Sequence, residues 1–292
     1  MELPASVLAL GEQLRGAGEI VPDPALFSDS HVFDAERERI FLLPWTVADH
    51  TTRLAEDGRY FRCDAGARSL VLTRDDGGQI HALRNVCIHA GYPVCDAEEG
   101  PAERLVCLYH GWEYALDGEL LEPAFAGRVD RSRLRMARYP VSVRNGLIFV
   151  DLSGKEAAEE YADAVPPWLA DAVVVRRARY NTTWNWKFLR HFLQSSPHLF
   201  VDGAPDSRVE FGPLSSMLVQ GRRAVLIRII PRFSEQTDFQ VAVMDAEKTA
   251  EETGAPEEPD PVADGLSQAD TSAIWFDRRF VDWYWPLMSA DA

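Results

Sequence analysis

Two short segments of the chain each carry a cysteine and a histidine a few residues apart. The first segment holds Cys87 and His89, and the second holds Cys107 and His110. The pattern is Cys-x-His, then seventeen residues, then Cys-x-x-His. Thiolate sulfur and imidazole nitrogen are ligands for transition metals, and each segment supplies one of each. The spacing therefore predicts that two loops together bind a metal centre through two sulfurs and two nitrogens.

A two-iron cluster of the Rieske type requires this mixture of ligands. One iron takes two thiolates and the other takes two neutral imidazoles, which raises the reduction potential to roughly −150 to +300 mV. Gly91 and Gly111 follow the two ligand pairs and permit tight loop backbones. Zinc is the alternative, because it also binds two cysteines and two histidines. Zinc fingers usually place both cysteines in one arm, so the mixed arms favour a [2Fe–2S] cluster on these four residues.

The sequence around the ligands resembles the Rieske domain of Rieske non-heme iron oxygenases, the class that hydroxylates rings or removes O- or N-methyl groups. The likeness begins at residues 74–82 and continues through 111–118, which match the family's Gly-Trp-x-Tyr-x-x-x-Gly run. Ala90 stands where the family often has Arg, and Leu108 where it often has Pro. Neither is a ligand position, so the resemblance implies the same cluster here.

Strands are expected to position these two segments. The β-prone runs are 69–73, 79–83, 112–116, 119–121 and 146–150. The first two are joined by Asp76-Gly77 and the next two by Asp117-Gly118, and both dipeptides are hairpin signals. We therefore expect an all-β Rieske domain at residues 38–152, preceded by an N-terminal helical segment at 1–37.

Residues 153–292 are expected to form an oxygenase-type catalytic domain, which makes the whole chain α+β. The resemblance implies an antiparallel sheet around a long helix, a START-like helix-grip fold. The runs expected as its strands are 176–183, 224–230 and 239–243. Residues 246–267 are rich in Glu, Asp, Pro and Ala, which predicts a solvated or mobile loop.

In the family, the long helix opens with Asn-Trp-Lys and then carries a bridging carboxylate and two histidine ligands of a mononuclear Fe(II). A later carboxylate completes the two-His, one-carboxylate set. This chain has Asn185-Trp186-Lys187, and His198 falls on the first histidine position. Ser195 stands at the bridging carboxylate, and Gly203 stands at the second histidine. Two of the three helix positions therefore lack the side chain that the family has there, which makes a mononuclear iron doubtful.

Three residues are candidates for an unusual iron site. His198 keeps the aligned position, although a core or helix-end histidine is the simpler interpretation. Asp202 would share a face with His198 on a continuous helix, but a surface acid is the simpler role. Asp270 lies near the family's carboxylate ligand, with the alignment loose by about one residue. His191 cannot join His198, because seven helical residues span about 10.5 Å.

Two functions of different kinds follow from the resemblance. Family subunits pack head to tail in trimers, so each cluster feeds the iron of its neighbour. In the first hypothesis, this chain passes electrons from a ferredoxin or flavin reductase to a second oxygenase subunit with an intact iron site, in a heteromeric and trimeric ring. In the second, the chain is a self-sufficient mono- or dioxygenase that holds iron with an unusual ligand set and acts on a small organic substrate.

Other classes of protein fit the sequence less well. A purely structural or regulatory relative does not need an intact cluster motif. A reductase is excluded, because no glycine-rich dinucleotide fingerprint follows a strand and the electrons must come from another protein. A net charge of −16 argues against nucleic acid and anionic membrane surfaces and favours solubility, with docking of a basic redox partner as a lesser interpretation.

Cysteine usage and hydropathy complete the sequence-based expectations. Four cysteines in 292 residues are too few for a disulfide framework, and Cys63 and Cys95 are expected to be small buried residues. No run of 18 apolar residues suggests a membrane span, and the first residues lack the pattern of a signal peptide. We expect a cytoplasmic protein.

Overall fold

The structure is a computed structural model of the 292-residue chain. It describes residues 24–42, 45–66, 68–122, 134–153, 161–249, 260–269 and 278–289. The chain divides into two compact units: residues 44–171 form one, and residues 1–43 with 172–292 form the other. The sequence-based boundaries of 1–37, 38–152 and 153–292 stay predictions, and the structural division assigns residues up to 43 to the same unit as the C-terminal half.

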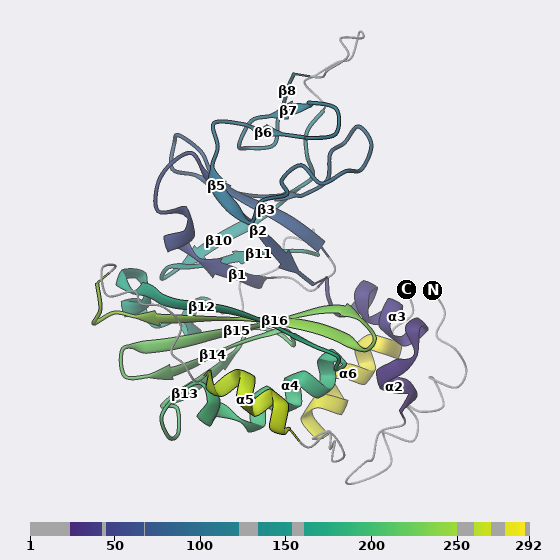
Figure 1. Ribbon diagram of the computed structural model, residues 1–292, viewed down its shortest axis with the longest axis vertical. Coiled ribbons are helices and arrows are strands. Elements are labelled where there is room, and N and C mark those ends of the chain that lie inside the picture. The colour runs from purple at the N-terminus through teal and green to yellow at the C-terminus, as the bar shows by residue number, and fades with distance from the viewer. Residues whose placement is uncertain are drawn as a thin grey trace. The chain divides into compact units, whose positions relative to one another are not determined.

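The unit formed by residues 44–171 is built from short antiparallel strands (Figure 1). They are β1 (Thr46–His50), β2 (Arg59–Ala65), β3 (Arg68–Arg74), β4 (Ile80–Arg84), β5 (Glu99–Pro101), β6 (Leu105–Val106), β7 (Glu113–Tyr114), β8 (Leu120–Glu122), β9 (Arg138–Tyr139), β10 (Val141–Arg144) and β11 (Leu147–Val150). They pair in three sheets, with the orders β5-β2-β3-β4-β9, β1-β11-β10 and β6-β7-β8. Each of the five strands expected here from the sequence is present, at slightly different bounds.

The hairpin between β3 and β4 has a clear physical cause. The Asp75 carboxylate accepts hydrogen bonds from the backbone N–H of Gly77 at 3.0 Å and of Gln79 at 2.9 Å. Gly78 adopts a φ of 76°, a conformation that glycine reaches without steric cost. The predicted turn is therefore correct, and it fixes the pairing register of the two strands that lead into the first ligand segment.

The second unit is a five-stranded antiparallel sheet with helices on one face. Its strands are β12 (Val173–Thr182), β13 (Ser207–Glu210), β14 (Ser215–Gln220), β15 (Arg223–Phe233) and β16 (Gln236–Asp245), in the order β12-β16-β15-β14-β13. Its helices are α2 (Ala25–Ser28), α3 (Ser30–Arg39), α4 (Trp186–Ser195), α5 (Pro261–Gln268) and α6 (Arg278–Ser289). The predicted α+β class is confirmed. No helix in the described part of the chain has the length and apolarity needed to cross a membrane.

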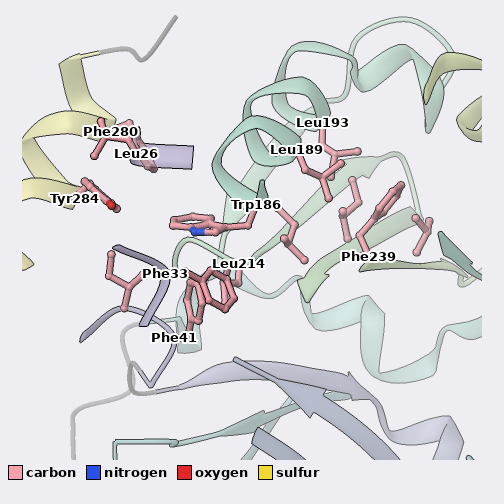
Figure 2. Close-up of a cluster of buried hydrophobic side chains, with 14 of the residues drawn as sticks. Leu26, Phe33, Phe41, Trp186, Leu189, Leu193, Leu214, Phe239, Phe280 and Tyr284 are labelled. Carbon is pink, nitrogen blue, oxygen red and sulfur yellow. The ribbon is translucent and has the colours of Figure 1, made fainter. Parts of the chain in front are cut away.

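One side of that sheet forms the larger hydrophobic core with the helices. Alternate residues of β15 and β16 point to this side, as strand geometry requires. Figure 2 shows Phe239 of the sheet with Leu189 and Leu193 of α4, and Trp186 beside residues of the N-terminal helical segment and α6. The helices are therefore held mainly by apolar burial.

A buried ionic network ties three helices together inside this core. Glu36 of α3 and Lys187 of α4 are fully buried and lie 2.5 Å apart. Glu36 also accepts hydrogen bonds from Trp186 Nε1 at 2.7 Å and from the Tyr284 hydroxyl of α6 at 2.5 Å. Burial lowers the pKa of Lys187 and raises that of Tyr284. Trp186 and Lys187 of the Asn-Trp-Lys motif therefore both bind the carboxylate of Glu36, which comes from α3 near the start of the chain.

Two expectations for this unit are wrong. The sequence predicts that helix α4 continues past His198, but the helix ends at Ser195. Ser196 precedes Pro197 and has φ −122° and ψ 51°, in keeping with the restriction that proline places on the residue before it. The expected loop at 246–267 includes part of α5, whose first turn starts with Pro261 and is capped by the Asp260 carboxylate on Val262 N.

The Glu36–Lys187 pair predicts a measurable loss of stability. We expect Lys187→Met to lower the free energy of unfolding by about 3–5 kcal/mol, because it leaves Glu36 buried without its cation. Urea unfolding monitored by tryptophan fluorescence measures this change. Lys248→Met removes an exposed lysine and should change stability by less than about 0.5 kcal/mol. Equal effects of the two substitutions would contradict the prediction.

Candidate metal centre

The first ligand loop, residues 87–92, follows β4 and closes on itself. Cys87 N–H donates to the carbonyl of Tyr92 at 2.7 Å, and Gly91 N–H donates to the carbonyl of Cys87 at 2.9 Å. Gly91 has a φ of 76°. These bonds fold the loop so that the Cys87 side chain is buried while His89 is exposed.

The second ligand loop, residues 107–112, lies between β6 and β7 and repeats this geometry. Cys107 N–H donates to the carbonyl of Trp112 at 2.9 Å, and Gly111 N–H donates to the carbonyl of Cys107 at 2.8 Å. Gly111 has a φ of 68°. Cys107 is buried and His110 is half-buried. Each loop therefore directs its thiol inward and its imidazole outward.

The two histidines lie beside each other, although they come from different loops. The ring centroids of His89 and His110 are 4.6 Å apart with the planes at 68°. Two imidazoles on one metal must approach to this range, because metal–nitrogen bonds are only about 2.1 Å long. The two cysteines belong to one buried cluster of apolar side chains. The site therefore has a sulfur side, where the two buried thiols lie, and a nitrogen side, where the two imidazoles meet.

Tyr114 connects the small sheet to the sulfur side. Its hydroxyl lies 3.1 Å from Cys87 Sγ and accepts a hydrogen bond from the backbone N–H of Ile88 at 3.3 Å. Burial, together with the hydrogen bond to Cys87, raises the pKa of Tyr114 well above its usual value. If Cys87 binds a metal as a thiolate, the phenol O–H is the donor in this contact, and such a hydrogen bond tunes a metal centre.

This donor set fits a two-iron cluster better than a single metal ion. No group of three or more His, Cys, Asp or Glu side chains converges as one ion would require, among the residues that the structure describes. A Rieske cluster does not need such a group, because each of its irons takes only two protein ligands. Trp112 Nε1 is also a buried donor without a protein partner in these described ranges. Cys87, His89, Cys107 and His110 therefore offer two buried thiols and two neighbouring imidazoles, the ligand types that a Rieske [2Fe–2S] group takes.

Of the three candidate mononuclear iron ligands, the structure describes His198 and Asp202, and neither lies on α4. His198 lies in a 3₁₀ turn (Pro197–Leu199) and is exposed, and Asp202 is exposed in the bends that follow. The two do not share a face of α4, which ends before either of them, and the exposed position of Asp202 agrees with the simpler role of a surface acid. Asp270 lies outside the described residues. Gly203 has a φ of 77°, which favours glycine over the histidine of the family.

A small cavity lies between α4 and the sheet. It has room for about one water molecule and is lined in part by Arg190, Gln194 and Glu210. Gln194 Nε2 donates to Glu210 at 3.2 Å, and the Arg190 guanidinium lies 3.9 Å from the same carboxylate. Burial raises the pKa of Glu210. The cavity also has apolar residues such as Leu193 and Ile227 in its wall, and it is too small for an organic substrate.

Comparisons with known proteins identify a Rieske domain in the region that contains the two ligand loops. A model of the Rieske [2Fe–2S] domain matches residues 44–133, which contain all four candidate ligands. The N,N-dimethyl phenylurea N-demethylase subunit alpha of Sphingobium sp. is 34% identical over 51% of this chain and 34% of its own length. The glycine betaine monooxygenase oxygenase subunit of Pseudomonas aeruginosa is 29% identical over 63% of this chain and 48% of its own. The chain matches about a third to a half of these relatives.

Solved structures extend the likeness to both units. The apo form of the quaternary ammonium Rieske monooxygenase CntA superposes with a TM-score of 0.70 at 18% identity, over 98% of each chain. Naphthalene 1,2-dioxygenase from Rhodococcus sp. superposes with a TM-score of 0.66 at 17% identity, over 97% of each chain. The chain contains a Rieske [2Fe–2S] domain and has the fold of Rieske oxygenases. Over about half of its length the chain is similar in sequence to an alpha subunit, that of the N-demethylase.

The contact between Tyr114 and Cys87 could not be predicted from the sequence. Tyr114 belongs to the recognised run 111–118, but the spacing gives no sign that its hydroxyl reaches Cys87, 27 residues earlier. The pairing of β6 with β7, which sets Leu105 opposite Tyr114, positions it there. Cys63 and Cys95 are buried as expected, and burial raises the pKa of Cys95 to about 12.

The hydrogen bond of Tyr114 predicts a change in reduction potential. We expect Tyr114→Phe to lower the potential of the cluster, because the lost donor stabilises the more electron-rich reduced state. A loss of about 1.4 kcal/mol would appear as about 59 mV for one electron. Mediated redox titration monitored by EPR measures the shift. Tyr60→Phe, at a tyrosine packed on the same core, is the control, and an equal potential in both variants would refute the assignment.

Proposed function

We propose that this chain is a Rieske electron-transfer component of an oxygenase. Cys87, His89, Cys107 and His110 would hold a [2Fe–2S] cluster, which supplies one-electron chemistry when bound. The electrons would come from a ferredoxin or flavin reductase and pass to the mononuclear iron of a partner oxygenase subunit. The contrast between the complete ligand loops and the exposed His198 and Asp202, neither of which lies on α4, carries this proposal.

The surface around the histidines supports exchange of electrons with another protein. Among the residues that the structure describes, most of the exposed large apolar side chains lie in the ligand loops or the small sheet β6-β7-β8: Ile88, Tyr92, Val106, Leu108, Tyr109 and Leu121. Leu108 alone is 80% exposed. An apolar patch around a redox centre is suited to a docking surface, because contact there excludes water and shortens the path for the electron.

A partner that carries the iron follows from what α4 lacks. The bridging and second histidine positions of the family are Ser195 and Gly203 here. Ser195 Oγ donates to the carbonyl of His191 at 2.8 Å, so this hydroxyl is used within the helix. In a head-to-tail ring, a subunit with a cluster would still function if its neighbour held the iron. A heteromeric trimer is the assembly that this function requires.

The second candidate function is a self-sufficient oxygenase. It is favoured by the names of the relatives, which include an N-demethylase, a glycine betaine monooxygenase and choline monooxygenases. Iron would then be held by His198, Asp202 and Asp270, with a small N-methylated compound as the substrate. The two described ligands of this set lie after the end of α4 and do not share a helix face.

Iron counting separates the two functions. We expect two irons and two sulfides per chain in the purified protein, with the EPR signal of a reduced Rieske centre and no zinc. Cys107→Ser should lose the cluster, whereas His198→Ala and Asp202→Ala should leave the iron content unchanged. A third iron that disappears in His198→Ala would support the self-sufficient oxygenase, and bound zinc would overturn both functions.

A turnover assay gives an independent result. The chain supplied only with a ferredoxin, its reductase and NADH should not consume glycine betaine or N,N-dimethyl phenylurea. Product formation at a rate proportional to the concentration of this chain would refute the electron-transfer assignment.

A further inference from the structure

The two ligand loops are related by an approximate repeat that extends beyond the ligands. In each loop, the cysteine N–H donates to the carbonyl of the fifth residue after it: Tyr92 in the first loop and Trp112 in the second. These two aromatic residues therefore occupy equivalent positions. Only Trp112 belongs to the family pattern recognised in the sequence, and Tyr92 has no role in the ligand set.

Each of these aromatic residues reaches toward the histidine of the opposite loop. The Trp112 ring stacks on His89 with the centroids 4.8 Å apart and the planes at 8°. Tyr92 stacks on Tyr109 of the second loop at 4.1 Å and 23°. Tyr109 in turn packs against the ring of His110 at 3.8 Å and 48°. One aromatic ring therefore packs on His89, whereas a stack of two aromatic rings packs on His110.

We propose that Tyr92 and Tyr109 form a two-ring shield over His110, with Tyr92 as a positioning residue that holds Tyr109 on the imidazole. Both tyrosines are 52% exposed, so neither is held by burial in the core. The stacking contact between the loops is the interaction that orders them. The shield limits the access of water to one side of the nitrogen-ligated iron. This inference rests on the proposed cluster ligands.

The shield has a predictable effect on the redox equilibrium. Two thiolates and two neutral imidazoles leave an oxidised [2Fe–2S] group without net charge, and reduction adds a negative charge. Removing water disfavours the charged state. The shield should therefore lower the potential, and its loss should raise it. This is the opposite of the change expected for Tyr114→Phe. The sign of the change in potential therefore distinguishes loss of the shield from loss of the Tyr114 hydroxyl.

The test compares four variants with the cluster loaded. Tyr92→Ala and Tyr109→Ala should each shift the equilibrium toward the reduced form by roughly threefold to tenfold, where tenfold is about 59 mV for one electron. Tyr92→Phe keeps the ring and should match the wild type. Leu108→Ala removes a more exposed apolar side chain of the same loop region, one with no ring to stack, and should leave the potential unchanged.

A second measurement reports water directly. In D₂O, pulsed EPR of the reduced cluster should show deeper deuterium modulation in Tyr92→Ala than in the wild type and no change in Tyr92→Phe. If Tyr92→Ala does not load a cluster, Tyr92→Leu replaces it, since leucine keeps bulk but offers no flat face. Wild-type potential and modulation in the loaded alanine or leucine variant would overturn the shield. A wild-type protein without iron and sulfide would instead refute the proposed function itself.

Discussion

The hydrogen bond from each ligand cysteine to the fifth residue after it is the constraint on which the metal centre depends. That bond closes a loop of six residues and leaves the thiol and the imidazole on opposite sides of the backbone. The glycine before the closing residue adopts a positive φ, which a side chain would oppose. Because both loops close in the same way, the two thiols enter the buried cluster and the two imidazoles meet above it.

This geometry also determines what surrounds the ligands. The strands β6 and β7 bring Leu105 and Tyr114 opposite each other on either side of the second loop, and the Tyr114 hydroxyl reaches Cys87 in the first. One hydroxyl thus connects a sulfur ligand to the small sheet. On the imidazole side, contacts between aromatic rings link the loops instead. Hydrogen bonding acts at the buried sulfur side, and ring packing acts at the exposed nitrogen side.

The placement of the four candidate ligands on two loops could be predicted from the sequence because their spacing is local. A cysteine and a histidine two or three residues apart on a turn define most of the geometry, and the hairpin signals around them identify the strands. The end of α4 depended instead on one proline: Ser196-Pro197 could have predicted it, but the aligned His198 argued for a longer helix. The cap at Asp260-Pro261 likewise marked α5 inside an otherwise acidic segment. The contacts of Tyr92 and Tyr114 depend on how distant segments pack, which spacing alone does not reveal.

A complete set of cluster ligands and a broken set of iron ligands can occur in one chain because the two sites are built differently. The cluster loops are closed by their own backbone bonds, so each survives changes elsewhere. The resemblance implies an iron site on a continuous helix, whereas here α4 ends at Ser195, before Pro197, and Gly203 has a positive φ. Helix α4 is still retained, because Asn185 caps it and Trp186 and Lys187 bind Glu36. The start of the helix therefore serves the fold, while its end at Ser195 comes before His198 and Asp202.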